Sequence, residues 1–167
     1  QAGALVHVYD KCGNPFGVAL YNRPARVPLR VLAHGDLEAD EQVLDKLLEN
    51  ACALREDFLR LKETTDAYRV VHSDADSLSG LIVDRYGDTL SIEVHSLGIY
   101  QRLPRIIEKL HARLGTHRQL VHVEPRIARM EDIVPRENLN SENVREVKIS
   151  ENGVRYAVNF ESGHKTG

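Results

Sequence analysis

The sequence predicts an α+β protein, and three observations support this fold class. Short runs of alternating apolar residues recur along the chain, and Gly, Pro, Asn and Asp bound them as they bound β-strands. Two longer segments repeat apolar residues at three- and four-residue steps, which is typical of amphipathic helices. The chain has 167 residues, of which 42% are hydrophobic and 28% charged, so it can bury a core.

Residues 1–35 are predicted to form β structure. Ala4–Tyr9 alternates as a strand, and Phe16–Tyr21 is the return strand after a turn rich in Gly, Asn and Pro. Val27–Leu32 is a third strand, and Pro28 places it at a sheet edge or marks its start, because proline cannot donate to the ladder. We expect a small β-barrel or part of one.

Residues 36–66 are predicted to hold one linking helix, within Asp40–Lys62. Asp36 or Asp40 is the candidate N-cap. This section carries ten acidic residues against four basic ones, which we interpret as a solvated helix face. The apolar residues that recur at helical spacing are Leu44, Leu47, Leu48, Ala51, Leu54, Phe58 and Leu61.

Residues 67–125 are predicted to form a small α+β domain in the order strand, strand, strand, helix, strand. The helix is expected at Tyr100–Leu114, with Pro104 in its first turn and Gly115 ending it. A unit this small needs a neighbour to complete its core. The strands are expected at Tyr68–His72, Leu81–Asp84, Thr89–His95 and Gln119–Val123.

Residues 126–167 are predicted to contain a linker and a β-hairpin. Arg126–Asn143 shows no periodicity and is assigned as the linker. The hairpin strands are Val144–Ser150 and Val154–Phe160, and they turn at Asn152-Gly153, because both residues tolerate positive φ. A lone two-stranded hairpin is only marginally stable in water, so it should dock on the middle domain or on another copy of the chain.

The charge distribution sets the first section apart from the rest. Residues 1–35 hold four basic residues against one acidic residue, although the whole chain has a net charge of -3. That net charge argues against a generic nucleic-acid binder, whereas a basic section attracts phosphate backbones. Arg23, Arg26 and Arg30 are the candidate phosphate contacts, and the alternative is a solvated β surface. No apolar run reaches the roughly 20 residues that a membrane span needs, so no membrane partner is expected.

Few residues carry the pattern of a catalytic or metal site. The eight histidines lack zinc-ligand spacing, so no metal site is predicted, and His72 and His95 alternate with apolar strand residues. Carboxylates that lie close in sequence could form a cluster for acid–base chemistry, and the alternative is turn chemistry and loop solubility. These carboxylates are Asp74, Asp76, Asp84 and Asp88.

The two cysteines do not predict catalysis. Cys12 and Cys52 lie far apart in unlike contexts, so no disulfide is expected, which suits a reducing cytoplasm. Cys12 in its turn could be a nucleophile, but no base accompanies it in sequence, and the alternative is a solvent-facing thiol. Glycine-rich nucleotide loops and the Gly-x-Ser-x-Gly motif are also missing from the sequence. We therefore predict no catalytic residue in this chain.

Two sequence blocks resemble one enzyme family, and the resemblance covers nearly the whole chain. Tyr68–Asp88, which reads YRVVHSDADSLSGLIVDRYGD, resembles the middle domain of bacterial large-subunit ribosomal RNA methyltransferases. These are cytosine-C5 enzymes that use S-adenosylmethionine, and their order is a PUA domain, a middle domain and a Rossmann-like catalytic domain. The ending GHKTG at Gly163–Gly167 is similar to the family's Gly-(His/Gln)-Lys-Thr-Gly. Residues 1–35 resemble only the later part of a PUA domain, and Ser77 and Ser79 replace the family's usual Gly and Pro.

The resemblance implies a role for each section. Residues 1–35 would be a partial PUA-like β-barrel that binds ribosomal RNA through the three arginines. The middle domain would be a spacer and packing platform, in which Asp84 and Arg85 fix a hairpin against a neighbour. The chain would then be the non-catalytic amino-terminal portion of a cytoplasmic methyltransferase, inactive by itself. The residues that would approach S-adenosylmethionine in the intact enzyme are His164, Lys165, Thr166 and Gly167.

Two other functions fit the same sequence. One is a free-standing RNA-binding module, and the other is an oligomerisation module, for example a homodimer in which the acidic helix and the middle sheet pair with another copy. A gene product that continues past Gly167 with aromatic residues, Asp-Gln-Arg and a Gly-rich strand–helix turn would favour the methyltransferase. A stop codon there would favour a module.

Overall fold

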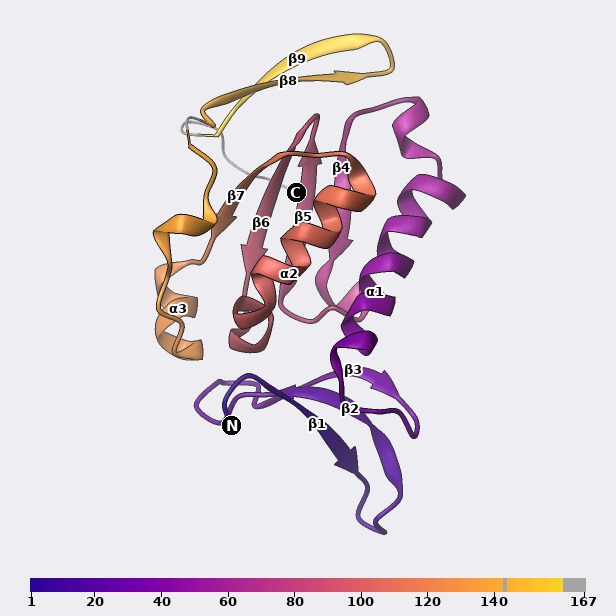
Figure 1. The fold of residues 1–167 in the computed structure, drawn as a ribbon, viewed down its shortest axis with the longest axis vertical. Coiled ribbons are helices and arrows are strands. Elements are labelled where there is room, and N and C mark those ends of the chain that lie inside the picture. Colours follow the sequence, from indigo (N-terminus) through magenta and orange to yellow (C-terminus); the bar gives the residue numbers. More distant parts are fainter. Residues whose placement is uncertain (143, 161–167) are drawn as a thin grey trace.

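The computed structural model describes residues 1–142 and 144–160, and it confirms the α+β class. In this described part, a three-stranded sheet in the order β1-β2-β3 is followed by a four-stranded sheet in the order β4-β5-β6-β7 and by the pair β8-β9. Figure 1 shows the first sheet at one end of the molecule and the β8–β9 hairpin at the other. The middle sheet and the helices α1, α2 and α3 lie between them.

The first sheet is antiparallel, and its three strands were predicted. They are β1 (Ala4–Tyr9), β2 (Pro15–Tyr21) and β3 (Leu29–His34). β3 starts two residues later than predicted, because residues 22–28 turn back on themselves, with the Asn22 N–H donating to the Pro28 carbonyl at 2.8 Å. The sheet is open and closes no barrel within the described residues. The likeness to a partial PUA-like barrel stays a prediction.

The linking helix starts where its cap was predicted and ends earlier than predicted. The Asp40 side chain accepts a hydrogen bond from the Gln42 N–H at 2.9 Å at the start of α1 (Glu41–Ala53). A π-helical turn, η1 (Leu54–Phe58), follows directly. The predicted continuation to Lys62 is wrong, because Arg60 has a φ of 51° and a short 3-10 turn, η2 (Leu61–Glu63), comes next.

The π turn also changes which residues face the core. The Leu59 N–H bonds to the Leu54 carbonyl five residues back, so this turn is wider than an α turn and shifts the following side chains around the axis. The residues of the predicted apolar stripe face the core up to Ala51, which is buried, whereas Leu54 and Phe58 beyond it are exposed. Phe58 is 80% exposed, whereas Glu56 is only 4% exposed.

The middle domain has the predicted order of elements. The strands β4 (Ala67–His72), β5 (Leu81–Tyr86) and β6 (Thr89–Val94) are antiparallel. The helix α2 (Leu97–Leu114) then crosses over to β7 (Arg118–His122), which lies parallel to β6. The chain thereby builds a strand–helix–strand unit beside an antiparallel hairpin.

Helix α2 starts three residues earlier than predicted, at Leu97 and not at Tyr100. Pro104 therefore lies inside the helix and not in its first turn, which corrects that assignment. The sequence did not predict the start at Leu97 because Gly98 follows it, and glycine is a poor helix former. Its missing side chain has a packing reason: a Cβ at Gly98 would lie 2.7 Å from Leu20 Cδ2 of the first sheet.

Residues 126–143, assigned as a linker, contain a helix. The helix α3 (Pro125–Glu131) has proline in its first turn, and Asp132 ends it with a φ of 58°. Seven residues are too few for a helical period to show in the sequence. A 3-10 turn, η4 (Glu137–Leu139), follows.

The C-terminal hairpin has the predicted turn and docks on the middle domain. It consists of β8 (Glu146–Glu151) and β9 (Val154–Asn159), with positive φ at Asn152 and Gly153. The Ser150 N–H donates to Asp66 Oδ1 at 2.8 Å. The rings of Tyr86 and Phe160 meet edge to face with centroids 5.4 Å apart. These contacts supply the partner that an isolated hairpin needs.

One hydrophobic core joins the first sheet, α1 and the middle domain. Leu20 and Leu32 of the first sheet belong to the same cluster as Leu44 and Leu48 of α1. Ile92 of β6 and Leu103 of α2 belong to it too. The first sheet therefore packs on the other elements as part of a continuous interior.

Candidate nucleic-acid interface

The loop between β2 and β3 carries two of the three predicted phosphate contacts. Arg23 and Arg26 are exposed on this loop, between the buried Asn22 and the start of β3. Neither arginine has a hydrogen bond or ion pair to another described residue. Two unpaired guanidinium groups on one exposed loop can each donate two parallel hydrogen bonds to a phosphate.

Arg30, the third predicted contact, is held inside the molecule. Its guanidinium donates to Glu131 Oε1 at 2.9 Å, to the His95 carbonyl at 3.1 Å and to Ser79 Oγ at 3.3 Å. The side chain is only 18% exposed. Arg30 therefore joins β3 to the middle domain and to α3, a role that the sequence did not predict.

Glu131 is the centre of this junction. Its carboxylate accepts from Arg30, from Asn22 Nδ2 at 3.0 Å and from the backbone N–H of Leu97 at 3.1 Å. The last contact is with the first residue of α2, where an anion is stabilised by the helix dipole. Asn22 also donates to the Glu131 carbonyl at 2.8 Å. One carboxylate at the end of α3 thus holds the first sheet against the amino end of α2.

A cavity of about 280 Å³ lies next to this junction, between the β2–β3 loop, the middle domain and α3. Arg26 and Arg30 both line it, whereas Arg23 does not. The other lining residues are Val27, Ser73, Asp74, Gly80, Ile82, His95, Ile127, Met130 and Glu131.

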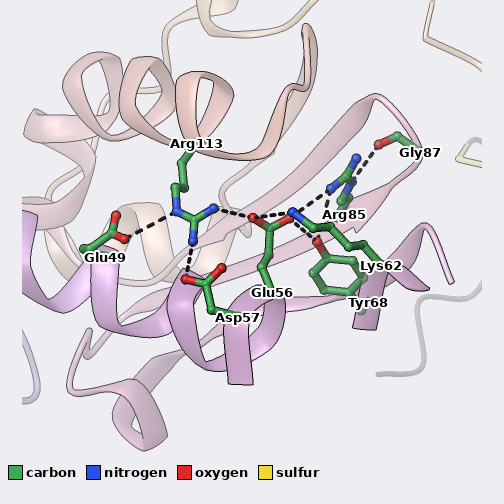
Figure 2. Close-up of polar contacts among 8 residues, drawn as sticks. All are labelled: Glu49, Glu56, Asp57, Lys62, Tyr68, Arg85, Gly87 and Arg113. Carbon is green, nitrogen blue, oxygen red and sulfur yellow. Dashed lines mark hydrogen bonds and ion pairs between the residues drawn. The ribbon is translucent and has the colours of Figure 1, made fainter. Parts of the chain in front are cut away.

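A second polar network fixes the linking helix on the sheet. Figure 2 shows Glu56 between Arg113 on one side and Arg85, Lys62 and Tyr68 on the other. Its carboxylate accepts from Arg113 at 2.6 Å and from the Tyr68 hydroxyl at 3.0 Å, and it lies 3.4 Å from the Arg85 guanidinium. The Glu56 side chain is 1% exposed. A buried charge needs such partners, and here they come from β4, β5 and α2.

The prediction that Asp84 and Arg85 fix a hairpin is supported by their contacts. Asp84 pairs with Arg69 across the β4–β5 ladder at 2.8 Å. Arg85 Nε donates to the Gly87 carbonyl in the β5–β6 turn at 2.9 Å, and the same guanidinium reaches Glu56 on η1. Both side chains are thus engaged within the protein.

The possible carboxylate cluster does not form. Asp76 pairs with Arg55, Asp84 with Arg69, and Asp88 with Arg118. Hydrogen bonds from Arg118 hold the pKa of Asp88 below its usual value. Each of these three carboxylates thus has its own arginine, which leaves none paired with another acid for acid–base chemistry.

The cysteines are both free thiols, and they differ in exposure. Cys12 is exposed on the β1–β2 turn and Cys52 is buried in α1, where burial raises the pKa of its thiol to about 12. No group of three His, Cys, Asp or Glu side chains within the described ranges could hold a metal ion. The predicted donor-binding residues, His164 to Gly167, lie outside the described residues.

Known proteins similar to this chain were found both by sequence and by structure. The chain is similar over its whole length to ribosomal RNA methyltransferases. It is 27% identical over 177 residues to "Ribosomal RNA large subunit methyltransferase I" of Vibrio cholerae and 28% identical over 173 residues to the same enzyme of Alteromonas mediterranea, covering 100% of this chain in both cases. The chain spans 42% of the length of each of these relatives. No family model matches.

Solved structures share the fold. SMU.776, described as a candidate methyltransferase and crystallised with SAH, superposes with a TM-score of 0.70 at 20% identity. The match covers 95% of this chain and 40% of that one. A candidate SAM-dependent methyltransferase from Streptococcus mutans gives the same values. In the part of the chain that is described, we find no helix long and apolar enough to cross a membrane.

Proposed function

We propose that this chain is the RNA-binding and substrate-positioning amino-terminal portion of a ribosomal RNA (cytosine-C5) methyltransferase that uses S-adenosylmethionine. The observation that carries the proposal is the similarity over 100% of the chain to large subunit methyltransferase I, of which it spans 42%. The fold shared with a chain crystallised with SAH supports it.

The RNA contact in this proposal is the β2–β3 loop. Arg23 and Arg26 are exposed there and unpaired within the described residues. RNA phosphates attract such groups, and each neutralised phosphate releases counterions, which makes the binding depend on salt. The Arg30–Glu131 pair and the shared core hold this loop in a fixed position relative to the middle domain. That placement is what a substrate-positioning portion requires.

The amino end of α2 is not available as a site for S-adenosylmethionine. The unit β6–α2–β7 has the strand–helix–strand connection that often binds nucleotides at the helix amino end. Here the first N–H of α2, on Leu97, is already bonded to the Glu131 carboxylate. The space beside Gly98 is filled by Leu20. The methyl donor should therefore bind in another part of the intact enzyme, and His164 to Gly167 remain its proposed contacts in this chain.

Two binding measurements test the proposal. The chain should shift a labelled transcript of large-subunit ribosomal RNA in a gel at a concentration where an equal mass of duplex DNA does not shift. Calorimetry should detect no binding of S-adenosylmethionine. Failure to bind the ribosomal transcript would contradict the RNA-binding role, and micromolar donor binding would show that the active site has been misplaced.

An oligomerisation module, such as a homodimer, is the alternative, and exposed apolar side chains favour it. Phe58 and Leu59 are 80% and 51% exposed, and Val154 and Tyr156 on β9 are 52% and 49% exposed. Apolar groups of this size on a surface often mark interaction sites. Sedimentation of the chain at micromolar concentration separates the two functions, because a stable dimer that binds no RNA would favour the module.

A further inference from the structure

The cavity of about 280 Å³ between the β2–β3 loop and the middle domain has the composition of a nucleotide pocket. We propose that it binds one unpaired nucleotide of the RNA, with the base inside the cavity and its phosphate at Arg26. This inference rests on the proposed function and specifies it, because it gives the RNA a second kind of contact besides charge. Single-stranded RNA is recognised in this way, through splayed bases held against side chains.

The walls of the cavity suit the faces of a base. Val27 of the loop, Ile82 of β5 and two residues of α3, Ile127 and Met130, line it. Val27 is exposed, and the other three are half-buried. The four side chains come from three separate elements, so the fold places apolar groups around a space that they do not fill. Ligand sites typically combine such apolar walls with a few polar groups.

The polar groups suit the edge of a base and its phosphate. Arg26 is an exposed donor without a partner among the described residues. Asp74 and Ser73 also line the cavity. A carboxylate can accept from base N–H groups, and the Ser73 hydroxyl, which already accepts from the Gly80 N–H at 3.0 Å, has capacity for a second bond. Asp74 repels a phosphate, which places the phosphate on the Arg26 side. Each part of a nucleotide thus has a matching group.

Arg30 gives the lining of the cavity a second cation. Contacts from its guanidinium to Glu131, His95 and Ser79 hold this cation in place. Its Nε has no hydrogen-bond partner within the described part of the chain, but it is closed to solvent, so a ligand in the cavity does not reach that atom. A charged group fixed in advance loses little entropy when a ligand binds.

The experiment compares two arginines on the same loop. Fluorescence anisotropy would measure binding of labelled octacytidylate, octauridylate and an eight-base-pair RNA duplex to the chain and to its variants. Arg26→Ala removes a charge that lines the cavity, and Arg23→Ala removes an equal charge outside it. Val27→Trp fills the cavity from a side chain that is 48% exposed, and Val134→Trp, at a residue that is 79% exposed and does not line the cavity, is the control.

The proposal predicts that both single strands bind at least tenfold more tightly than the duplex. Arg26→Ala removes the cation proposed to hold the phosphate, and Val27→Trp fills the space proposed for the base. Each should lower the affinity for single strands about fivefold or more, since the loss of one central contact in an interface has an effect of this size. Arg23→Ala should have a smaller effect, and Val134→Trp should have none.

Two results would overturn the nucleotide pocket. Equal losses for Arg26→Ala and Arg23→Ala, with normal binding by Val27→Trp, would mean that RNA is held by loop charge alone. The proposed function would survive that result. Absence of binding to any RNA, the ribosomal transcript included, would instead contradict the proposed function together with the pocket. Thermal unfolding of each variant confirms that the comparison is made on folded protein.

Discussion

The guanidinium of Arg30 lies 2.9 Å from the carboxylate of Glu131, a residue 101 positions later in the chain. This ion pair joins the sheet that carries the exposed arginine loop to the end of α3, and the same carboxylate bonds to the first N–H of α2. Together with the shared hydrophobic core, this acidic side chain therefore holds the proposed RNA contact in position relative to the middle domain.

Replacing Glu131 should destabilise the whole protein. Glu131→Ala leaves the Arg30 guanidinium and Asn22 partly unpaired, and breaking such a buried pair costs about 3 to 5 kcal/mol of unfolding free energy. Glu124→Ala, an exposed acid just before α3, is the control and should change little. Urea denaturation gives both values. In a double-mutant cycle, Arg30→Ala and Glu131→Ala should lose less together than the sum of their separate losses; strict additivity would mean that the two residues are not coupled.

Two of the three acids that contact Arg113, Glu56 and Asp57, should differ in their contribution to stability. Glu56 is 1% exposed and Asp57 is 61% exposed. Glu56→Ala should cost about 3 kcal/mol because it leaves cations without their buried partner, whereas Asp57→Ala should cost less than about 1 kcal/mol. Chemical denaturation of the two variants at the same salt concentration measures the difference. Similar losses would show that Glu56 is not the organising residue of the network in Figure 2.

The π turn makes a prediction about packing. Phe58 is 80% exposed and Leu48 is 4% exposed, although both belong to one apolar stripe in the sequence. Phe58→Ser should change the unfolding free energy by less than about 0.5 kcal/mol, and Leu48→Ala should lower it by about 2 to 5 kcal/mol. Thermal unfolding of the two variants and of the unmodified chain measures both changes. A large loss for Phe58→Ser would place this ring in the core and argue against the π turn.

The two thiols should react at very different rates. Burial raises the pKa of Cys52 to about 12, and the thiolate, which is the reactive form, is therefore scarce at pH 8. As the folded pKa is the higher one, this thiol stays neutral at all pH values below it. Ellman's reagent should release about one equivalent quickly from native protein, from the exposed Cys12. The second equivalent should appear only in denaturant, and two fast equivalents would contradict the burial of Cys52.

The elements that the sequence predicted well are those defined by local chemistry. Ala4–Tyr9 alternates clearly, Gly115 stops α2 with a φ of 67°, and Asn152-Gly153 makes the final turn. In each case the deciding residues are close neighbours in the chain. A general rule also predicted that the hairpin docks on the middle domain or on another copy of the chain, because a lone hairpin is only marginally stable; the structure shows contacts with the middle domain.

The features that the sequence missed depend on distant partners. Glu131 sits in a helix too short to show a period, and Asn22, one of its partners, is 109 residues away. The inward turn of Glu56 depends on Arg85 and Arg113, which belong to other elements. Arg30 looked equivalent to Arg23 and Arg26, and only the fold separates one paired arginine from two unpaired ones.

The most direct test of the central claim is the salt dependence of RNA binding by the double variant Arg23→Ala/Arg26→Ala. Arg30 is left intact because its removal would disturb the Glu131 junction. The slope of log affinity against log salt should flatten by roughly 1.5 relative to the unmodified chain, since each lost phosphate contact removes about 0.7 to 0.9. An unchanged slope, with the ribosomal transcript still bound, would show that the β2–β3 loop is not the RNA contact.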